Sequence, residues 1–460
     1  MIVVLGNIYS KIIRCTPDEF KLYREVLTFF APNYWFNPRF KAGNWDGQIK
    51  LFQTKEFPTG LLPSVQSVIP NLIVKERKSR IDLTKIESNI LNTKKMSGKY
   101  AYQLDVVRTA VDKRRGIISV ATGGGKTVIA AGIIKYLNLP TLFLVPTKDL
   151  LLQTHAVFTK EIGGVIGIWG SGKEDLQKIT VAMPKTVVNR LSKKKYKEFV
   201  KSRECIFCDE CHLSSAKTWQ KVLKASTGAG YRYGLSGTPF CKTDLDNANV
   251  MAYLGGEIYK ISNDDLIQLK ANSTPVVTFF KLMHLTKEVK YPEIYTACIV
   301  ESKRRNNQAV DTALNLLKDS KEVVLMLVQK IEHGNILAQL LKDKDLDVTF
   351  CYGDSDIELR EKALDDLRSG KIKVLILSRI GELGVDIPNL SSLIYAGGGK
   401  STVGTLQRIG RLLRNPTNKR NLVKFYDFYD YSIPFLEQHS QKRLEDYTEE
   451  GFEIQYVDVT

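Results

Sequence analysis

The sequence predicts an α/β fold in which two tandem domains, each built around a parallel sheet, follow a small α+β domain. Three observations predict it. With 460 residues the chain is long enough for about three domains. From about residue 95, short apolar runs alternate with longer helix-compatible stretches, and after Thr274-Pro275 this alternation starts again. We expect the domains to span residues 1–92, 93–272 and 273–460.

The first 92 residues carry helix and hairpin signals. Thr16-Pro17-Asp18-Glu19 combines an N-cap, a proline at the first helical position and a capping box, which predicts a helix to about Phe30. Residues 37–52 then alternate apolar and polar side chains around Asp46-Gly47, a dipeptide favoured in tight hairpins. The charged and polar stretch at 75–99 is expected to be a linker.

Buried strands are predicted wherever a short apolar run is bounded by turn or helix signals. In the second domain these runs are 116–121, 141–146, 179–184, 205–210 and 231–239. In the third domain they are 323–329, 373–379 and 392–398.

The overall charge suggests a polyanionic partner. Lys and Arg number 67 against 50 Asp and Glu, a net charge of +17, which points most often to nucleic acid, with a basic protein lacking such a partner as the alternative. No apolar run is long enough to span a bilayer, so no membrane partner is expected. The N-terminus lacks the features of a secretory signal, which predicts reduced cysteines and a cytoplasmic location.

A glycine-rich segment, "SVATGGGKTVIA" (119–130), follows a predicted strand and opens an apolar helix. In that context it predicts a phosphate-binding loop, although Val120 stands where the usual pattern has its first glycine. Glycines 123–125 let backbone N–H groups converge on phosphate oxygens, Lys126 would neutralise them, and Thr127 would ligate Mg²⁺. A glycine-rich turn without a ligand is the alternative.

A second triplet, Gly399-Lys400-Ser401, fits the Gly-Lys-Ser/Thr pattern as Gly125-Lys126-Thr127 does. A working site also needs a downstream strand that ends in acidic residues, and "KFYDFYD" (424–430) is the nearest candidate. We therefore expect a single ATP site, at the first triplet.

The segment "CIFCDECH" (205–212) permits two kinds of chemistry. Asp209 and Glu210 at the end of a buried strand suit magnesium binding and the orientation of an attacking water. The cysteines with His212 also resemble zinc or haem ligands. However, residues three apart on a strand face opposite sides, so Cys205 and Cys208 could not readily share a metal. We expect neither haem nor structural zinc.

Asp209-Glu210-Cys211-His212 resembles the DExH box of superfamily 2 helicases, and seven further motifs occur in that family's order. They are Tyr102-Gln103, "ATGGGKT" (121–127), "VPTKDLLLQ" (145–153), "GLSGTP" (234–239), "VQKIEHG" (328–334), "GELGVDIP" (381–388) and "QRIGRLLR" (407–414). The resemblance covers roughly residues 95–430. Among subgroups it is most similar to the phage UvsW-type branched-DNA helicases, and more distantly to the XPB and RecG motors. It implies two RecA-like domains with ATP in the cleft between them.

The resemblance also implies roles for individual residues. Those with a catalytic role would be Glu210, Asp209, Lys126, Arg411, Arg414 and Gln407, where the two arginines match arginine fingers. Those that meet ATP would be Gln103, Thr122, Gly123, Gly124, Gly125, Lys126, Thr127, Gly384 and Asp386, with Thr127 and Asp209 on Mg²⁺. Those that couple nucleotide state to the domains would be His212, Ser236, Thr238 and Arg408.

Contacts with nucleic acid in such motors are mostly to the backbone. The candidates by motif position are Thr147, Lys148, Gln329, Lys330, Ser378 and Arg379. The basic runs 192–197 and 302–307 are expected to be mainly solvated helix faces. Aromatic residues at 34–45 lie among basic ones and could stack on splayed bases, but we favour a role in the core of the first domain.

The sequence thus predicts an ATP-dependent DNA motor, favoured as a monomer, that unwinds or branch-migrates forked or four-way junctions in the nucleoid or a viral replication compartment. An RNA helicase and a duplex translocase that does not unwind remain alternatives in the same class. A nucleic-acid-binding scaffold with a vestigial ATP site is the alternative from a different class.

Overall fold

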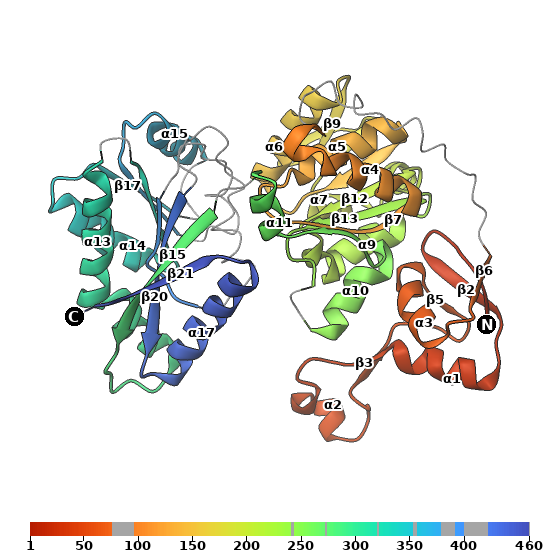
Figure 1. The fold of residues 1–460 in the computed structure, drawn as a ribbon. Coiled ribbons are helices and arrows are strands. Elements are labelled where there is room, and N and C mark those ends of the chain that lie inside the picture. Colours follow the sequence, from red (N-terminus) through yellow and green to blue (C-terminus); the bar gives the residue numbers. More distant parts are fainter. Residues whose placement is uncertain are drawn as a thin grey trace. The chain divides into compact units, whose positions relative to one another are not determined.

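The computed structural model describes residues 1–75, 96–240, 243–271, 274–319, 322–352, 357–378, 392–399 and 422–459. Most of the linker predicted at 75–99 lies outside them. The chain divides into two compact units, one containing Met1–Val120 and Gly125–Ile261, the other Ala121–Gly124 and Ser262–Thr460. Figure 1 follows the chain through both.

The first unit begins with a small mixed sheet in the order β5-β2-β1-β6. Strand β1 runs antiparallel to β2 and parallel to β6. The strands are β1 (Ile2–Val4), β2 (Tyr9–Arg14), β5 (Glu56–Pro58) and β6 (Ile73–Lys75), and the helices are α1 (Pro17–Val26), η2 (Thr59–Leu61) and α3 (Leu62–Val68). This part is the predicted small α+β domain.

Helix α1 starts as predicted and ends earlier. The capping box is confirmed, because the Thr16 hydroxyl accepts from the Glu19 N–H at 3.2 Å and the Glu19 carboxylate accepts from the Thr16 N–H at 2.8 Å. The helix ends at Val26, and its expected extension to Phe30 is wrong because Thr28–Phe30 forms strand β3, which pairs with β4 (Gln48–Lys50).

Residues 28–50, which we call the arm, therefore form a long hairpin. The strand expected before Asp46-Gly47 is wrong, since the arm contains η1 (Tyr34–Phe36) and α2 (Pro38–Lys41) there. The local sequence explains this helix, because proline is its first residue and the Asn37 side chain caps it by accepting from the Arg39 N–H at 3.0 Å.

The rest of the first unit is an eight-stranded sheet in the order β10-β9-β11-β8-β12-β13-β7-β14, parallel except for the β9/β10 pair. The strands are β7 (Arg115–Val120), β8 (Thr141–Leu144), β9 (Ile166–Gly170), β10 (Lys173–Asp175), β11 (Ile179–Ala182), β12 (Cys205–Asp209), β13 (Tyr231–Ser236) and β14 (Glu257–Ile261). All five predicted strands are present, whereas β9, β10 and β14 were not predicted.

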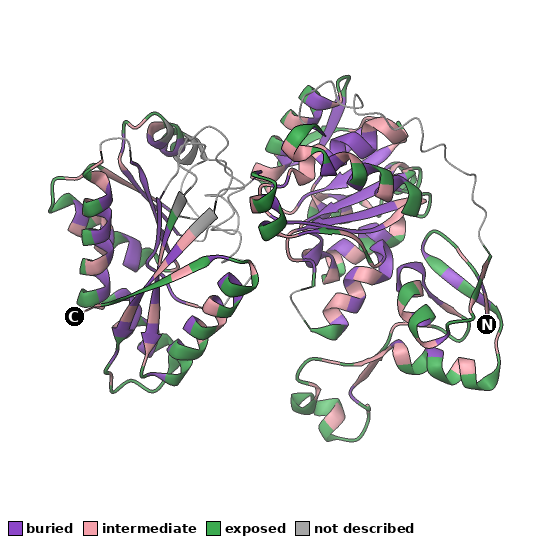
Figure 2. Ribbon diagram, viewed as in Figure 1, coloured by how far each residue is buried: buried purple, intermediate pink, exposed green. Residues whose placement is uncertain are grey.

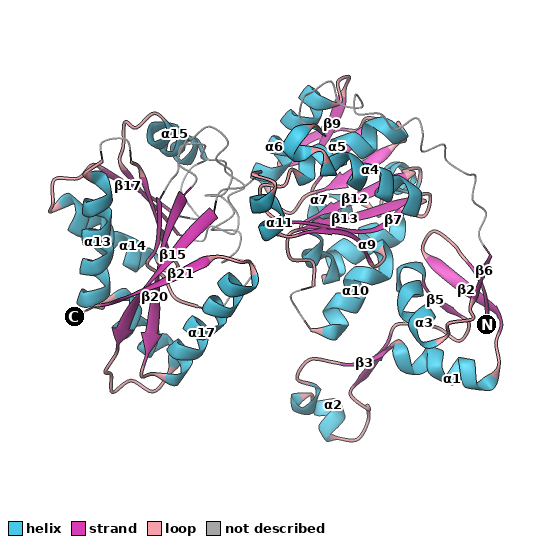
Figure 3. Ribbon diagram, in the orientation of Figure 1, coloured by secondary structure: helices cyan, strands magenta, loops and turns pink. Residues whose placement is uncertain are grey.

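Helices cover both faces of this sheet, with α4, α5 and α6 on one side and α9 and α10 on the other (Figure 3). The helices are η5 (Gly98–Tyr100), α4 (Tyr102–Lys113), α5 (Lys126–Leu137), α6 (Lys148–Glu161), α7 (Pro184–Arg190), α8 (Lys194–Lys201), η6 (Cys211–Ser215), α9 (Lys217–Ala225) and α10 (Asp244–Leu254). A short helix, α11 (Asn263–Gln268), follows β14 and opens the second unit.

The small mixed sheet packs against this α/β part of the first unit. One hydrophobic core cluster runs from Val3 and Leu61 to Trp219 and Leu254. The approach is close at Gly60, where an added Cβ would lie 1.9 Å from the carbonyl oxygen of Met251. The two parts therefore share a core.

The second unit is a seven-stranded parallel sheet in the order β17-β18-β16-β19-β20-β15-β21. One core cluster packs α15 and α17 on one face, and another packs α13 and α14 on the other. The central strands β16, β18 and β19 are buried throughout, whereas β21 is mostly exposed (Figure 2). The strands are β15 (Thr274–Met283), β16 (Val324–Val328), β17 (Val348–Cys351), β18 (Val374–Ser378), β19 (Ser392–Tyr395), β20 (Leu422–Tyr431) and β21 (Glu453–Asp458). The helices are α12 (Tyr291–Tyr295), η7 (Thr296–Val300), α13 (Lys303–Leu317), α14 (Ile331–Lys342), α15 (Ile357–Arg368) and α17 (Pro434–Glu449).

The predicted fold class is confirmed: two parallel α/β sheets follow a small α+β part. Within the described ranges, no helix is both long and apolar enough to cross a membrane.

Candidate nucleotide and nucleic-acid site

The glycine-rich loop connects β7 to α5. Gly123 and Gly125 have φ angles of 90° and 82°, in the left-handed region that favours glycine. Gly125 is the N-cap of α5, and the N–H groups of a first helical turn have no partner within the helix. Lys126 begins α5 and donates from Nζ to the carbonyl oxygen of Val120 at 3.3 Å. A glycine loop, a helix N-terminus and an ammonium group together fit a phosphate.

Gln103, the predicted adenine contact, lies against this loop. It is a buried residue near the start of α4, and a Cβ added to Gly125 would lie 2.4 Å from its Nε2 atom. The loop and the side chain are therefore packed closely, and the φ of 82° at Gly125 makes any residue with a side chain strained at this position.

The acidic pair lies at the carboxyl end of the same sheet. Asp209 is the last residue of β12, which lies between β8 and β13, and β13 is followed by β7. Because parallel strands end at one edge, the segments after β7, β12 and β13 share that edge. Glu210 has a φ of 49°, a strained conformation for a residue with a side chain, and its N–H donates to Asp209 Oδ1 at 3.1 Å.

Glu210 belongs to a polar cluster that joins two predicted motifs. The His212 Nδ1 atom lies 3.4 Å from Glu210 Oε2 and 3.3 Å from the Ser236 hydroxyl. Ser236 donates to Glu210 Oε2 at 3.5 Å and accepts from the Thr238 N–H at 3.1 Å. The structure thus brings together the predicted water-orienting residue and three of the four predicted coupling residues.

The three cysteines of this segment behave as core residues. All three are buried, and burial raises the pKa of the Cys205, Cys208 and Cys211 thiols. Cys208 and Cys211 lie in a core cluster that does not contain Cys205. Metal binding requires thiolates. Among the described residues, no group of three or more His, Cys, Asp and Glu is placed to hold a metal ion.

The predicted nucleic-acid contacts have varied surroundings. Thr147 is the N-cap of α6 and accepts from the Leu150 N–H at 3.3 Å, while Lys148 and Lys330 are exposed. Gln329 donates to the Tyr395 hydroxyl at 2.9 Å, and Ser378 is a buried residue at the end of β18. Their contacts with nucleic acid stay predictions. Seven predicted residues lie outside the described part: Arg379, Gly384, Asp386, Gln407, Arg408, Arg411 and Arg414.

The arm carries exposed aromatic side chains. Trp35 and Phe36 are 50% and 69% exposed, so the core role that we favoured is wrong for them. They lie on one hairpin with the exposed Arg39 and Lys41, and the Lys41 Nζ is 5.9 Å from the Phe36 ring centre. Tyr34 supports the arm from within, because its ring packs edge-on against Phe40.

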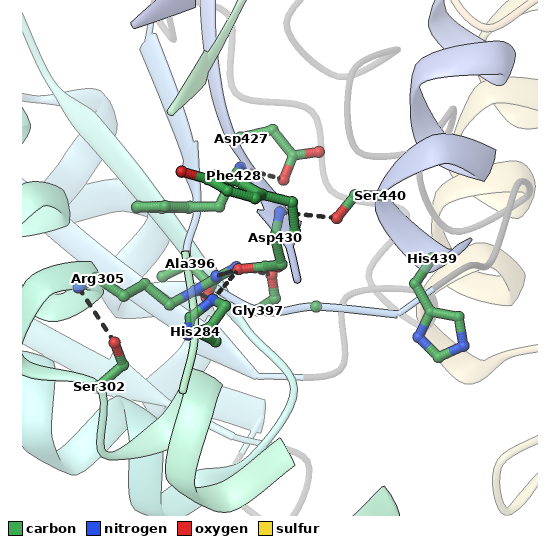
Figure 4. A network of polar contacts seen from close by, with 12 residues as sticks. His284, Ser302, Arg305, Ala396, Gly397, Asp427, Phe428, Asp430, His439 and Ser440 are labelled. Atoms are coloured by element: carbon green, nitrogen blue, oxygen red, sulfur yellow. Dashed lines mark hydrogen bonds and ion pairs between the residues drawn. The ribbon is translucent and has the colours of Figure 1, made fainter. Parts of the chain in front are cut away.

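Two buried arginines of the second unit were missed by the sequence analysis. Arg305, in a basic run expected to be solvated, is fully buried and pairs with Asp430 at 2.5 Å (Figure 4). Arg443 is also fully buried and pairs with Asp427 at 2.9 Å. Both carboxylates belong to the segment "KFYDFYD" (424–430), whose two aspartates therefore form buried ion pairs. Helical phase could have revealed Arg305, which shares the buried stripe of α13 with Ala309, Ala313 and Leu316.

A glycine loop and an acidic strand end lie on one parallel sheet, and His212 and Ser236 join the acidic pair to the segment after β13; together these features are typical of a nucleotide hydrolase. Three family models match successive parts of the chain: the UvsW N-terminal domain at residues 2–74, the res subunit of type III restriction enzymes at 83–241, and the helicase conserved C-terminal domain at 306–416. The chain belongs to the superfamily 2 helicases. Within that superfamily it is an ATP-dependent DNA helicase of the UvsW type.

Similar proteins agree with this assignment. The ATP-dependent DNA helicase uvsW of Enterobacteria phage T4 is 27% identical over 96% of this chain and 95% of its own length. The DNA 3'-5' translocase XPB2 of Sulfurisphaera tokodaii is 24% identical over 70% of this chain and 80% of its own. The structure of Dbp5 from S. cerevisiae bound to RNA and ADP BeF3 shares the fold, with a TM-score of 0.54, 16% identity, and coverage of 79% of this chain and 92% of that one.

Proposed function

We propose that this helicase acts on branched DNA, regressing forks, migrating branches and unwinding strands at forked or four-way junctions. One observation carries the proposal: an arm with exposed Trp35 and Phe36 belongs to a domain whose core is continuous with that of the motor domain. Aromatic side chains among basic ones stack on splayed bases, which a junction offers and a continuous duplex does not. The phage T4 relative uvsW is an ATP-dependent DNA helicase, which supports DNA as the substrate.

We also propose the division 1–92, 93–272 and 273–460, in which the last two domains open and close with the nucleotide, and we favour a monomer. The chain would work in the nucleoid or a viral replication compartment. Phosphate would be held by the loop and helix start at Thr122, Gly123, Gly124, Gly125, Lys126 and Thr127, with adenine beside Gln103. Mg²⁺, bound by Thr127 and Asp209, would neutralise charge on the transferring phosphoryl group.

The polar cluster around Glu210 provides a route by which ATP hydrolysis would be communicated to Thr238. Glu210 orients the attacking water, and Ser236 and His212 hold the same carboxylate oxygen. A change at Glu210 therefore reaches Thr238 through a single hydroxyl group. Arg411, Arg414 and Gln407 would complete the nucleotide site from the second RecA-like domain, together with Gly384, Asp386 and Arg408. Backbone contacts by Thr147, Lys148, Gln329, Lys330, Ser378 and Arg379 would track the DNA.

The test compares ATP hydrolysis by the wild type and Glu210→Gln on single-stranded DNA, blunt duplex, forked DNA, a four-way junction and structured RNA. We expect the strongest stimulation by forked and four-way DNA, and a loss of about 10²- to 10⁴-fold in Glu210→Gln. Glu204→Gln, the same change at an exposed side chain just before β12, is the matched control. Strongest stimulation by RNA would favour an RNA helicase. Stimulation by duplex without strand separation would favour a translocase, and no hydrolysis would favour a scaffold.

A second comparison tests the arm. Trp35→Ala with Phe36→Ala should lower the stimulation by forked DNA and leave that by blunt duplex DNA unchanged. Leu285→Ala, which shortens a side chain that is 86% exposed in the second unit, is the control. Equal loss on both DNAs would argue against a junction-specific role for the arm.

A further inference from the structure

Three helices on one face of the large sheet in the first unit expose basic side chains. Helices α7, α8 and α9 pack against one another, and Val187, Val200 and Val222 from them belong to one core cluster with Ile206 of β12. These buried residues fix which side of each helix faces the sheet, so the opposite side faces outward. All lysines and arginines of the three helices are exposed, and the only acidic residue of these helices is Glu198.

Helix α9 shows the pattern most clearly. Lys217, Lys221 and Lys224 are exposed, whereas Trp219 and Val222 between them are buried. Residues four and three positions apart lie along one side of a helix. At about 1.5 Å per residue the three lysines extend over about 10 Å, which is roughly the rise of three base pairs in a duplex.

Helices α8 and α7 continue this surface. On α8, which begins within the basic run 192–197, the exposed residues Lys194, Lys197 and Lys201 recur three and four positions apart. Helix α7 adds Lys185 and Arg190. We call these side chains, together with the three lysines of α9, the basic face.

The basic face differs from a helix surface that is only solvated. Such a surface usually carries both signs of charge, because like charges one turn apart repel. Helix α4, on the opposite side of the sheet (Figure 3), follows this rule: Arg108 pairs with Asp105 at 3.5 Å and Lys113 with Asp112 at 3.7 Å. Helix α9 has no acidic residue, so it cannot balance its own charge.

The lysines also stand where the helix dipole disfavours them. Helix α8 begins with Lys194 and Lys195, helix α9 begins with Lys217, and neither helix has an acidic residue in its first turn. The N-terminal end of a helix carries partial positive charge, so cations there lower its stability. This arrangement works against the helices themselves and favours an anion that comes from outside the protein.

The surroundings of the basic face indicate which kind of nucleic acid it fits. Residues 184–225 are all described, and no large hydrophobic side chain among them is exposed. Splayed bases need exposed rings for stacking, which the arm has and the basic face lacks. Backbone phosphates need only cations, and a duplex offers them at twice the axial density of one strand. The basic face therefore fits the backbone of a duplex.

The basic face reaches the domain that carries the arm. Just beyond the end of α9, the carbonyl of Thr227 accepts from the Asn7 side-chain amide at 3.0 Å. The core cluster behind α7, α8 and α9 also contains Val3 and Phe57 of the N-terminal domain. Helices and domain are thus parts of one packed body.

We propose that the basic face binds the phosphate backbone of a duplex branch of the DNA substrate, while the arm contacts unpaired bases. The inference rests on the proposed function and adds a second DNA-binding surface to it. It also gives the run 192–197 a role beyond that of a solvated helix face.

The experiment measures binding of a fluorescent blunt duplex, and of a single strand of equal length, to the full chain without nucleotide over a range of salt concentrations. The variant combines Lys217→Gln, Lys221→Gln and Lys224→Gln. The logarithm of affinity falls linearly with the logarithm of salt concentration, with a slope of about 0.9 for each phosphate contact. We expect the slope for the duplex to become smaller by about 2.7 and the slope for the single strand to stay unchanged.

The matched control combines Arg108→Gln, Lys113→Gln and Lys160→Gln. These exposed residues lie on α4 and α6, on the opposite side of the same sheet, so the control loses the same charge from another surface. It should bind the duplex with the wild-type slope. Arginine at the three α9 positions, which keeps the charge, should also keep that slope.

An unchanged duplex slope in the folded α9 variant would overturn the inference, and so would an equal change in the control. An equal change on the single strand would refute the assignment to a duplex. Loss of poly-glutamate binding with duplex binding intact would indicate an acidic protein partner instead. If thermal denaturation shows that the α9 variant does not fold, Lys194→Gln with Lys197→Gln and Lys201→Gln takes its place, with the same expected results.

The measurement also separates this inference from the proposed function. Binding is measured without ATP, so it does not depend on hydrolysis. A chain that binds the duplex through the basic face but shows no stimulation of hydrolysis by forked DNA would refute the proposed function alone.

Discussion

Gly60→Ala tests whether the N-terminal domain and the motor domain act as one body. Gly60 is buried in η2, and the added Cβ would lie 1.9 Å from Met251 O and 2.8 Å from both Ala252 O and Gly255 N. Real Cβ atoms essentially never come within 3.0 Å of such atoms. All three neighbours are backbone atoms at the end of α10, so no side chain can rotate away. Forcing an extra methyl group into a packed interior costs about 1–3 kcal/mol.

We expect that cost as a lower free energy of unfolding, measured by chemical denaturation of the full chain. Stimulation of ATP hydrolysis by forked DNA should fall, because the domain that carries the arm is no longer held firmly against the motor domain, while stimulation by blunt duplex DNA should be retained. Gly230→Ala is the matched control, since it adds the same methyl group 3.8 Å from Asn7 Oδ1, an ordinary contact in the same interface. A Gly60→Ala chain with wild-type stability and wild-type fork stimulation would refute the close packing of the two parts.

Two further predictions concern titratable groups. Burial, and then the charge of Arg305, lower the pKa of His333 to about 3, whereas the unfolded chain titrates near 6.5. Only the unfolded state then takes up this proton below pH 6.5, so stability falls by up to about 1.4 kcal/mol per pH unit as the pH drops from 6.5 towards 3. Denaturation at pH 7, 6 and 5 should show this slope, and His333→Gln should lack it; an equal slope in both chains would exclude His333 as its source. The buried thiols of Cys205, Cys208 and Cys211 have raised pKa values, so iodoacetamide at pH 8 should modify them only after denaturation. Rapid labelling of these three in the native protein, read by mass spectrometry, would contradict their burial.

The geometry of the candidate nucleotide site could be predicted from the sequence because it is mostly local. A loop between a strand and a helix fixes Lys126 within a few residues, and a strand end fixes Asp209 and Glu210. The parallel sheet then brings the two segments to one edge without further information. His212 and Ser236 meet for the same reason, since β12 and β13 are neighbours that end together.

The arm shows where local reasoning fails. Its alternation of apolar and polar residues suggested a strand. However, Asn37 caps a helix that begins at Pro38, so the capping signal and not the alternation decides the local structure. Exposure of Trp35 and Phe36 could not be predicted, because a core role depends on which other residues reach the hairpin. Burial of an aromatic side chain is decided by tertiary packing, and composition carries no record of it.

The buried arginines show the same limit for charge. A run such as "SKRRNN" was judged by its total charge, yet a helix places adjacent residues on different faces, so Lys303 and Arg304 are exposed while Arg305 is fully buried. Helical phase indicates that Arg305 faces the core, and physics then requires a partner for it. The partner, Asp430, lies 125 residues further along the chain, and only the sheet brings it within reach. A charged residue that falls in phase with the buried residues of a helix therefore predicts a binding partner, either a carboxylate or a set of carbonyl oxygens, that lies elsewhere in the chain. For Arg305 these partners are the carboxylate of Asp430 and the carbonyl oxygens of Ala396 and Gly397.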